Sequence, residues 1–143
     1  MAQRPNKTIA VLDVETTGFN HLSEEVTEIA VVLLDGLTGE EMGSFDTLID
    51  IEGKIPNKIV ELTGITNEMT SKYGMPKDMV TTYLQEMLKD TIVVAHNVQF
   101  DFQFIKEHFG IVPKYYYDTL AISRSLYPSE KTHKLGVICE RAG

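Results

Sequence analysis

The sequence predicts a single α/β domain built on a mixed β-sheet. Apolar, β-branched runs of strand length fill the first third of the chain, and runs with helical periodicity alternate with further strands after that. No linker, repeat or low-complexity run divides the 143 residues. A chain of this length can bury a core without disulfides, so we expect one domain over residues 1–143.

Three strands open the chain. Residues 7–14 are short and apolar, which suits a strand buried on both faces, and residues 29–34 have the same character. A turn cluster at 35–40 joins the second strand to residues 42–51, which roughly alternate apolar with polar. We therefore expect these three strands to be antiparallel neighbours.

Helices and strands alternate in the rest of the chain. Two helical segments follow residue 56, and the second begins at Pro76, since proline is favoured in a first turn. A buried strand at 91–95 precedes a helix that starts near Asn97, whose side chain is the expected N-cap. A short strand at 115–117, a helix at 119–126 and a last helical segment follow. The apolar faces that predict the helices are Met79, Val80, Tyr83, Leu84, Met87 and Leu88; Val98, Phe102, Ile105 and Phe109; and Leu135, Ile138, Cys139 and Ala142.

Composition excludes several classes of protein. Thirteen basic residues against 21 acidic ones give a net charge of −8, which disfavours a protein that coats duplex DNA. An enzyme that holds only a strand end remains compatible, because bound divalent cations supply positive charge locally. No apolar run is long enough to span a membrane, the first eight residues lack the apolar stretch of a signal peptide, and a lone cysteine forms no internal disulfide. We expect a reducing, cytoplasmic setting.

Asp13 and Glu15 close an otherwise apolar strand. Their two-residue separation points both carboxylates to one face, where they repel each other and lose solvation. Residues 16–18 contain no basic partner, so a Mg²⁺ or Mn²⁺ site is indicated. The alternative is that the strand ends earlier and both acids lie in solvent, as acids at strand ends often do.

A third carboxylate follows another buried strand. Asp101 lies in the first turn of the helix after Asn97, about 60° from the centre of its apolar stripe, and hence beside the core. Helix starts favour carboxylates and phosphates, and ligands collect at the carboxyl ends of strands. We therefore expect Asp13, Glu15 and Asp101 to converge.

Two phenylalanines of the same helix lie roughly opposite its apolar stripe. Phe100 is next to Asp101, which favours a role in stacking a base or lining a pocket. For Phe104, packing under a neighbouring helix is as well supported as a role in the pocket.

Four segments carry a family resemblance. Asp13-Val-Glu-Thr-Thr-Gly18 resembles the first motif of the DEDD exonucleases, the DnaQ-like superfamily on a ribonuclease H-like fold that includes proofreading subunits of bacterial replicative polymerases. His96-Asn-Val-Gln-Phe-Asp101 resembles the second motif. Glu61-Leu-Thr-Gly-Ile-Thr66 and Asp118-Thr-Leu120 are similar to two further segments, in family order.

The resemblance implies a metal-dependent 3′–5′ exonuclease acting on the 3′ end of single-stranded DNA, in proofreading or processing. In that family two metal ions bridge the scissile phosphate, so Asp13, Glu15 and Asp101 are the implied catalytic metal ligands, for Mg²⁺ or Mn²⁺. A DNA polymerase subunit is the implied partner. An RNA-trimming enzyme is one alternative, and a non-catalytic module of a polymerase assembly is another.

The resemblance also implies a substrate pocket. Its members would be Thr16, Thr17 and Gly18 beside the terminal nucleotide, Phe19 lining its pocket, Ile65 wedged against the terminal base, and His96 and Asn97 shaping the site. For His96 a structural role is an equal alternative.

The chain departs from the family pattern at its end. The third motif places a general-base histidine, or a tyrosine in another branch, near a fourth metal-binding aspartate on a final helix. Residues 133–143 resemble the helix before that motif, so we expect the fold to lack its final helix and turnover to be slow. His133 starts that preceding helix and is not the base, and residues 115–118 belong to the earlier Asp-Thr-Leu segment.

Other catalytic chemistries lack their motifs. The sequence has no Gly-x-Ser-x-Gly and no glycine-rich loop ending in Lys-Ser or Lys-Thr, and Cys139 lies on an apolar helical stripe. One cysteine and four scattered histidines do not suit a zinc site.

Overall fold

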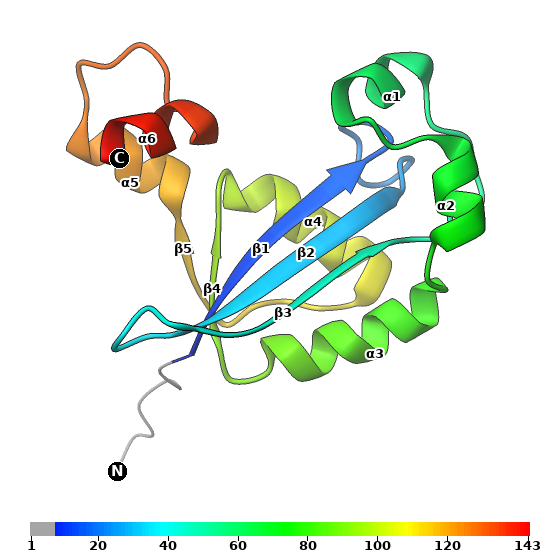
Figure 1. The fold of residues 1–143 in the computed structure, drawn as a ribbon, viewed down its shortest axis with the longest axis horizontal. Coiled ribbons are helices and arrows are strands. Elements are labelled where there is room, and N and C mark those ends of the chain that lie inside the picture. Colours follow the sequence, from blue (N-terminus) through cyan, green and yellow to red (C-terminus); the bar gives the residue numbers. More distant parts are fainter. Residues whose placement is uncertain (1–7) are drawn as a thin grey trace.

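The computed structural model describes residues 8–143, and the sheet in it is mixed, as predicted (Figure 1). Its five strands lie in the order β3-β2-β1-β4-β5. The first three are antiparallel neighbours, and β4 and β5 run parallel to β1. The strands are β1 (Thr8–Thr16), β2 (Val26–Asp35), β3 (Glu41–Leu48), β4 (Ile92–Ala95) and β5 (Tyr115–Asp118). The expected start of the first strand at Lys7 lies outside the described residues.

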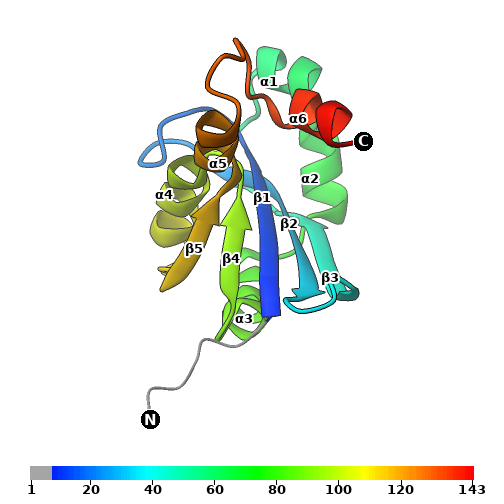
Figure 2. The ribbon, with the colours of Figure 1, turned by 90° about the vertical axis from the view of Figure 1, so that its left-hand side faces the viewer.

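Six helices accompany the sheet within residues 8–143. They are α1 (Asn57–Thr63), α2 (Asn67–Tyr73), α3 (Lys77–Leu88), α4 (Val98–Phe109), α5 (Thr119–Leu126) and α6 (Leu135–Ala142). Figure 2 shows α5 and α6 beyond the carboxyl ends of β4 and β5. This arrangement is the mixed α/β sheet that the sequence predicts, in the ribonuclease H-like form that the family resemblance implies.

The core lies on one face of the sheet. Alternation along β1 sends Ala10, Leu12 and Val14 into that core and turns Val11, Asp13 and Glu15 to the opposite face. The helices α3 and α4 cover the core face. Their buried apolar side chains are Val80, Leu84 and Leu88 from α3 and Val98, Phe104, Ile105 and Phe109 from α4. The two acids of β1 thus stand on the face away from the core.

The segment between residue 56 and Pro76 forms two helices, α1 and α2, where the sequence predicts one. Gly64 ends α1 in the left-handed conformation, with φ 76°, which glycine adopts without steric cost. Thr66 then caps α2, because its side chain accepts a hydrogen bond from the N–H of Met69 at 3.1 Å. A local stop and a local start therefore divide the segment before α3 begins.

Asn97 does not cap α4 with its side chain, so that prediction is wrong. The residue adopts a left-handed conformation, with φ 64° and ψ 59°, and its side chain makes no capping bond. Asparagine tolerates this conformation better than most residues. Its backbone N–H instead donates to Asp118 Oδ1 at 2.9 Å, which ties the start of α4 to the start of α5.

Two of the predicted apolar faces are less buried than expected. In α3, Met79 and Tyr83 remain about half exposed, because only the narrower stripe through Val80 and Leu84 faces the sheet. In α6 no residue is buried, and Cys139 is exposed. The apolar stripe of α6 has no covering element among residues 8–143.

Phe104 belongs to the core, although it lies off the predicted stripe of α4. Its side chain is fully buried, and its ring lies 5.0 Å from that of Phe100, 5.9 Å from that of His108 and 6.3 Å from that of His21. His21 comes from the loop between β1 and β2. That loop widens the buried face of α4, which periodicity along the helix alone does not show.

We expect Phe104→Ala to lower the free energy of unfolding by about 3–5 kcal/mol, because it leaves a cavity inside the core. Urea titration measures this change. Phe102→Ala, which removes a half-buried ring from the same helix, is the matched control and should cost less. Equal losses from the two variants would contradict the placement of Phe104.

No helix among residues 8–143 combines the length and the apolar character needed to cross a membrane.

Candidate active site

Asp13 and Glu15 lie within β1, which continues to Thr16, so the alternative in which the strand ends before the acids is wrong. Asp13 is exposed and Glu15 is half-buried. Although Asp13 is exposed, partial desolvation of its carboxyl by the surrounding protein raises its pKa, and the N–H of Val14 and the charge of His96 oppose that rise. Burial also raises the pKa of Glu15, and the neighbouring charge of Asp13 raises it further. Both acids therefore hold protons more tightly than solvated carboxyls do.

Asp101 is the most perturbed acid of the site. It lies in the first turn of α4 and is only 3% exposed. Burial, the charges of Asp13, Glu15 and Asp118, and a partly compensating hydrogen bond from the N–H of Val14 together raise its pKa to about 8. The charges of Asp13 and Glu15 on β1 are therefore near enough to Asp101 on α4 to raise its pKa. Without a cation Asp101 is protonated at neutral pH.

This donor set fits a divalent cation in its chemistry. Carboxylate oxygens are the ligands that Mg²⁺ and Mn²⁺ prefer, and a cation would offset the repulsion that raises the pKa of Asp101. Within residues 8–143, however, no three His, Cys, Asp or Glu side chains stand close enough together to hold one ion. Shared coordination therefore requires these carboxylates to turn toward one another.

Two further acids adjoin the site, and the sequence interpretation missed both. Glu28 of β2 lies opposite Glu15 in the strand register, and its carboxyl is hydrogen-bonded to Asp46 of β3. Burial, this bond and the charges of Asp46, Glu15 and Asp13 raise the pKa of Glu28 to about 7. Glu28 lies just before the apolar run at 29–34, and its place opposite Glu15 depends on the strand register.

The threonine hydroxyl groups at the end of β1 form hydrogen bonds within the loop that follows this strand. Thr17 Oγ1 donates to Glu24 Oε2 at 2.5 Å and accepts from the N–H of Glu25 at 3.0 Å. Thr16 Oγ1 donates to the carbonyl of Gly18 at 2.5 Å. A side chain at Gly18 would begin 2.9 Å from Cδ of Glu24, so glycine leaves room for the Glu24 carboxylate. These bonds fix the loop beside Asp13 and Glu15.

Exposed aromatic surface lies at the start of α4. The Phe19 ring is 82% exposed and meets the Phe100 ring edge-on, with 6.3 Å between centroids. Phe100 in turn packs on Phe104, so Phe19 is supported from the core. Ile65, the expected wedge, is only 4% exposed in the turn between α1 and α2. Its role at a terminal base stays a prediction.

His96 follows β4 and has both ring nitrogens engaged within the chain. Its Nε2 donates to the carbonyl of His133 at 2.8 Å, and its Nδ1 lies 2.9 Å from Thr119 Oγ1. The ring of His133 continues the network, with Nδ1 at 2.8 Å from Ser123 Oγ. This is the arrangement that the structural alternative for His96 expects, and it joins the site to α5 and to the segment before α6.

Asp118 is a second organising residue that the sequence interpretation treated only as a landmark. Its Oδ1 accepts from the N–H of Leu120 and from the N–H of Asn97, each at 2.9 Å. It therefore caps α5 and fixes the turn that presents Asp101. An aspartate directly before a predicted helix is the N-cap signal that could have identified it.

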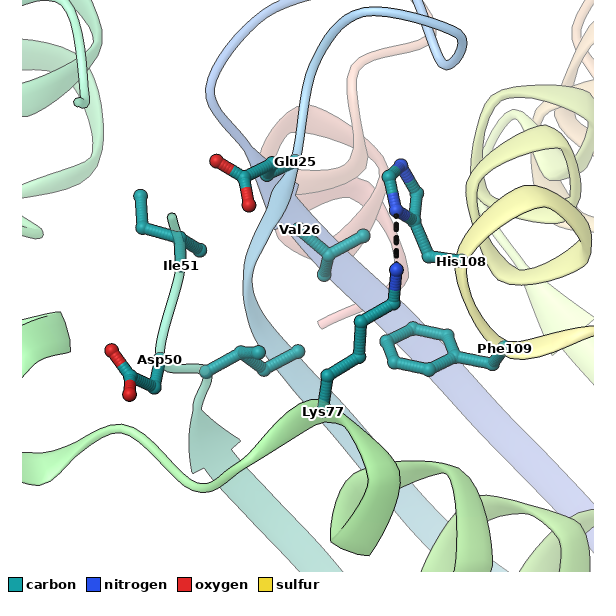
Figure 3. Close-up of a pocket in the computed structure, with 8 residues that line it drawn as sticks. Glu25, Val26, Asp50, Ile51, Lys77, His108 and Phe109 are labelled. Carbon is teal, nitrogen blue, oxygen red and sulfur yellow. Dashed lines mark hydrogen bonds between the residues drawn. The ribbon is translucent and has the colours of Figure 1, made fainter. Parts of the chain in front are cut away.

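A small pocket at the start of α3 and the end of α4 is separate from the carboxylates (Figure 3). Lys77 Nζ and His108 Nδ1 meet there at 3.2 Å. Burial and the Lys77 charge lower the pKa of His108, against the opposing effect of the nearby backbone of Glu24 and His21. His108 Nε2 faces that backbone without a hydrogen bond of good geometry among the described residues. None of the predicted site residues lines this pocket.

The chain is similar to known proteins over most of its length. The chain matches the exonuclease family RNase T over residues 10–143. It is 38% identical over 138 residues to the PolC-type DNA polymerase III of Clostridium perfringens, covering 93% of this chain and 9% of that protein. For the PolC-type enzyme of Thermotoga maritima the identity is 36% over 141 residues, covering 95% and 10%. The chain thus spans about a tenth of these relatives.

Among solved structures, E. coli exonuclease I in complex with a dT13 oligonucleotide aligns with a TM-score of 0.75 and 18% identity. The alignment covers 90% of this chain and 32% of exonuclease I, which shows a shared fold. The family match extends over nearly all of the described residues, and the PolC-type relatives exceed 30% identity over nine-tenths of the chain. The chain therefore belongs to the exonuclease family.

Proposed function

We propose that this chain is a metal-dependent 3′–5′ exonuclease domain that removes nucleotides from DNA 3′ ends. One observation carries the proposal: Asp101 is a buried carboxyl whose pKa is raised to about 8, first by burial and then by the charges of Asp13, Glu15 and Asp118. Such an arrangement is costly to the fold unless a cation or a proton offsets the charge. A nuclease site gains from it, because the same carboxylates hold divalent ions against a phosphate.

Asp13, Glu15 and Asp101 would hold the ions, Mg²⁺ or Mn²⁺, and Asp101 would lose its proton as they bind. When bound, two such ions supply positive charge to the scissile phosphate and lower the pKa of the attacking water. Phe19 and Phe100 would stack the terminal base. The backbone of Thr16, Thr17 and Gly18 would also contact the terminal nucleotide. Ile65 would wedge against the terminal base, and His96 and Asn97 would shape the site.

Single-stranded DNA is the proposed substrate and a DNA polymerase the proposed partner, acting in the cytoplasm. The PolC-type relatives are DNA polymerases by name, and exonuclease I was solved with an oligonucleotide. An enzyme of net charge −8 suits a strand end better than a long duplex, because it offers few phosphate contacts.

We expect linear single strands to lose mononucleotides from the 3′ end in Mg²⁺ or Mn²⁺, and circular single strands of the same composition to stay intact. Strands labelled at the 5′ end should shorten stepwise, whereas a 3′ label should be released at once. Excess EDTA should stop both reactions. Cutting of circles, or early release of a 5′ label, would contradict the proposal.

The two alternatives predict different outcomes of that assay. If an oligoribonucleotide of matched sequence is shortened faster than the DNA, the chain is an RNA-trimming enzyme. A non-catalytic module would leave both intact, and it is the second candidate because no three metal-ligating side chains are gathered around one point in the described part of the chain.

A further inference from the structure

Charge is divided unevenly along the chain. Residues 8–109 carry six lysines and 18 acidic residues, so that part has a net charge of −12. Residues 110–143 carry five basic residues and three acidic ones, which gives +2. A polyanion that approaches the carboxylates is repelled by most of the described molecule, and this last part is the exception.

The positive part lies beside the site. Strand β5 leads directly into α5, and α5 and α6 stand beyond the carboxyl ends of β4 and β5 (Figure 2). Residues 127–134, which we name the 127–134 loop, connect these helices. The His96 bond to the carbonyl of His133 fixes the loop next to β4, and His96 is close enough to Asp13 to lower its pKa.

Further bonds hold the loop in shape. Arg141 Nη2 donates to the carbonyl of Thr132 at 2.9 Å and lies 3.2 Å from Glu130 Oε2. The ring of His133 is bonded to Ser123 of α5. The loop is therefore anchored to both of its helices and to the residue that follows β4.

Its two lysines keep their charge available. The Arg141–Glu130 pair neutralises the one acid of the loop and is the only ion pair among residues 8–143. Lys131 and Lys134 are exposed and unpaired in that range. Tyr127 is 46% exposed at the start of the same loop. Unpaired cations and an exposed aromatic ring within one segment are features with which proteins bind single strands.

We propose that the 127–134 loop binds the backbone of single-stranded nucleic acid next to its 3′ end, with Lys131 and Lys134 on phosphates and Tyr127 against a base. This inference rests on the proposed function, which places the 3′ end of the strand at the carboxylates. His96 is then a positioning residue, because it holds this loop beside the carboxylates. The loop supplies phosphate contacts that the acidic remainder of the chain does not.

Binding of a 5′-fluorescein oligothymidylate with phosphorothioate linkages, followed by fluorescence anisotropy in Mg²⁺, tests the inference. The Lys131→Ala/Lys134→Ala variant should bind at least about tenfold more weakly, since neither position can then pair with a phosphate. The slope of log K against log salt should fall by about 1.4, because each lysine–phosphate pair contributes about 0.7 to it. Lys89→Ala/Lys106→Ala, with the same charge change away from the loop, should match the unsubstituted chain in both quantities.

Tyr127→Leu separates stacking from charge. It should weaken binding by about fivefold or more while leaving the salt slope unchanged, because base stacking is not an ionic contact. Thermal melts of every variant check that the fold is retained.

The inference is overturned if the Lys131/Lys134 variant binds with the affinity and salt slope of its control. A loop that binds a protein instead of a nucleic acid would give the same result. It is overturned as well if the unsubstituted chain does not bind the oligonucleotide. Hydrolysis of an unmodified strand is measured separately. If the chain binds the oligonucleotide but does not hydrolyse an unmodified strand, only the proposed function is contradicted. If it hydrolyses the strand and the two lysine substitutions leave binding unchanged, only the loop inference is contradicted.

Discussion

Asp101→Asn is expected to reduce hydrolysis of a single-stranded DNA 3′ end by at least about 10²- to 10³-fold relative to the unsubstituted chain. That is the typical effect of removing one group that organises transition-state charge. Asparagine keeps the shape of the side chain and an oxygen that can accept the N–H of Val14, but it does not supply a negative charge. The fold should therefore persist while the site loses its most buried proposed ligand.

Initial rates of nucleotide release at saturating Mn²⁺ measure this effect. Glu107→Gln is the matched control, because it removes one exposed carboxylate from the same helix. It should leave the rate within about twofold, as surface substitutions change little. If the Asp101→Asn variant hydrolyses DNA at an unreduced rate, Asp101 takes no part in the reaction.

Without divalent cations, the free energy of unfolding should fall by about 2 kcal/mol between pH 6.5 and pH 8. In the folded chain the pKa of Asp101 is raised from 3.8 to about 8, so across this range the folded state holds a proton that the unfolded state has already lost. Stability contributed by that proton is lost as pH rises toward the folded pKa. Glu28, with a pKa raised to about 7, adds a loss of the same sign in the lower part of the range.

Urea titrations in EDTA across this range measure the slope. His108 adds a smaller change of the opposite sign at the lower end of the range, because its pKa is lowered in the fold and near pH 6.5 the unfolded state binds more of its proton. Asp101→Asn should flatten the profile and be more stable than the unsubstituted chain at pH 8, whereas Glu107→Gln should leave the slope unchanged. A profile that is flat or rises with pH in the unsubstituted chain would show that Asp101 is ionised in the fold.

Periodicity was sufficient to predict the layers of this fold. The apolar runs around Val14 and Ile29 and the helical stripe through Ile105 recur as central strands and as the core face of α4. Local backbone events were harder to predict. The separation of α1 from α2 at Gly64 and the left-handed Asn97 each depend on one or two residues.

Part of the site was also predictable. Two-residue spacing placed Asp13 and Glu15 on one face, and the helical angle placed Asp101 near them. Glu28 and Asp46 were missed because their relevance depends on strand register, which sequence periodicity alone does not specify. The position of the 127–134 loop depends likewise on long-range bonds such as that from His96 to His133.

The central claim is that Asp13, Glu15 and Asp101 share divalent ions, and thermal melting with and without Mn²⁺ tests it most directly. A ligand bound only by the folded state at a hundredfold excess over its dissociation constant adds about 2.7 kcal/mol, so Mn²⁺ should raise the Tm of the unsubstituted chain by roughly 5–10 °C. Asp101→Asn, Asp13→Asn and Glu15→Gln should each abolish most of that rise, and Glu107→Gln should keep it. A full rise in the Asp101 variant would contradict a shared site.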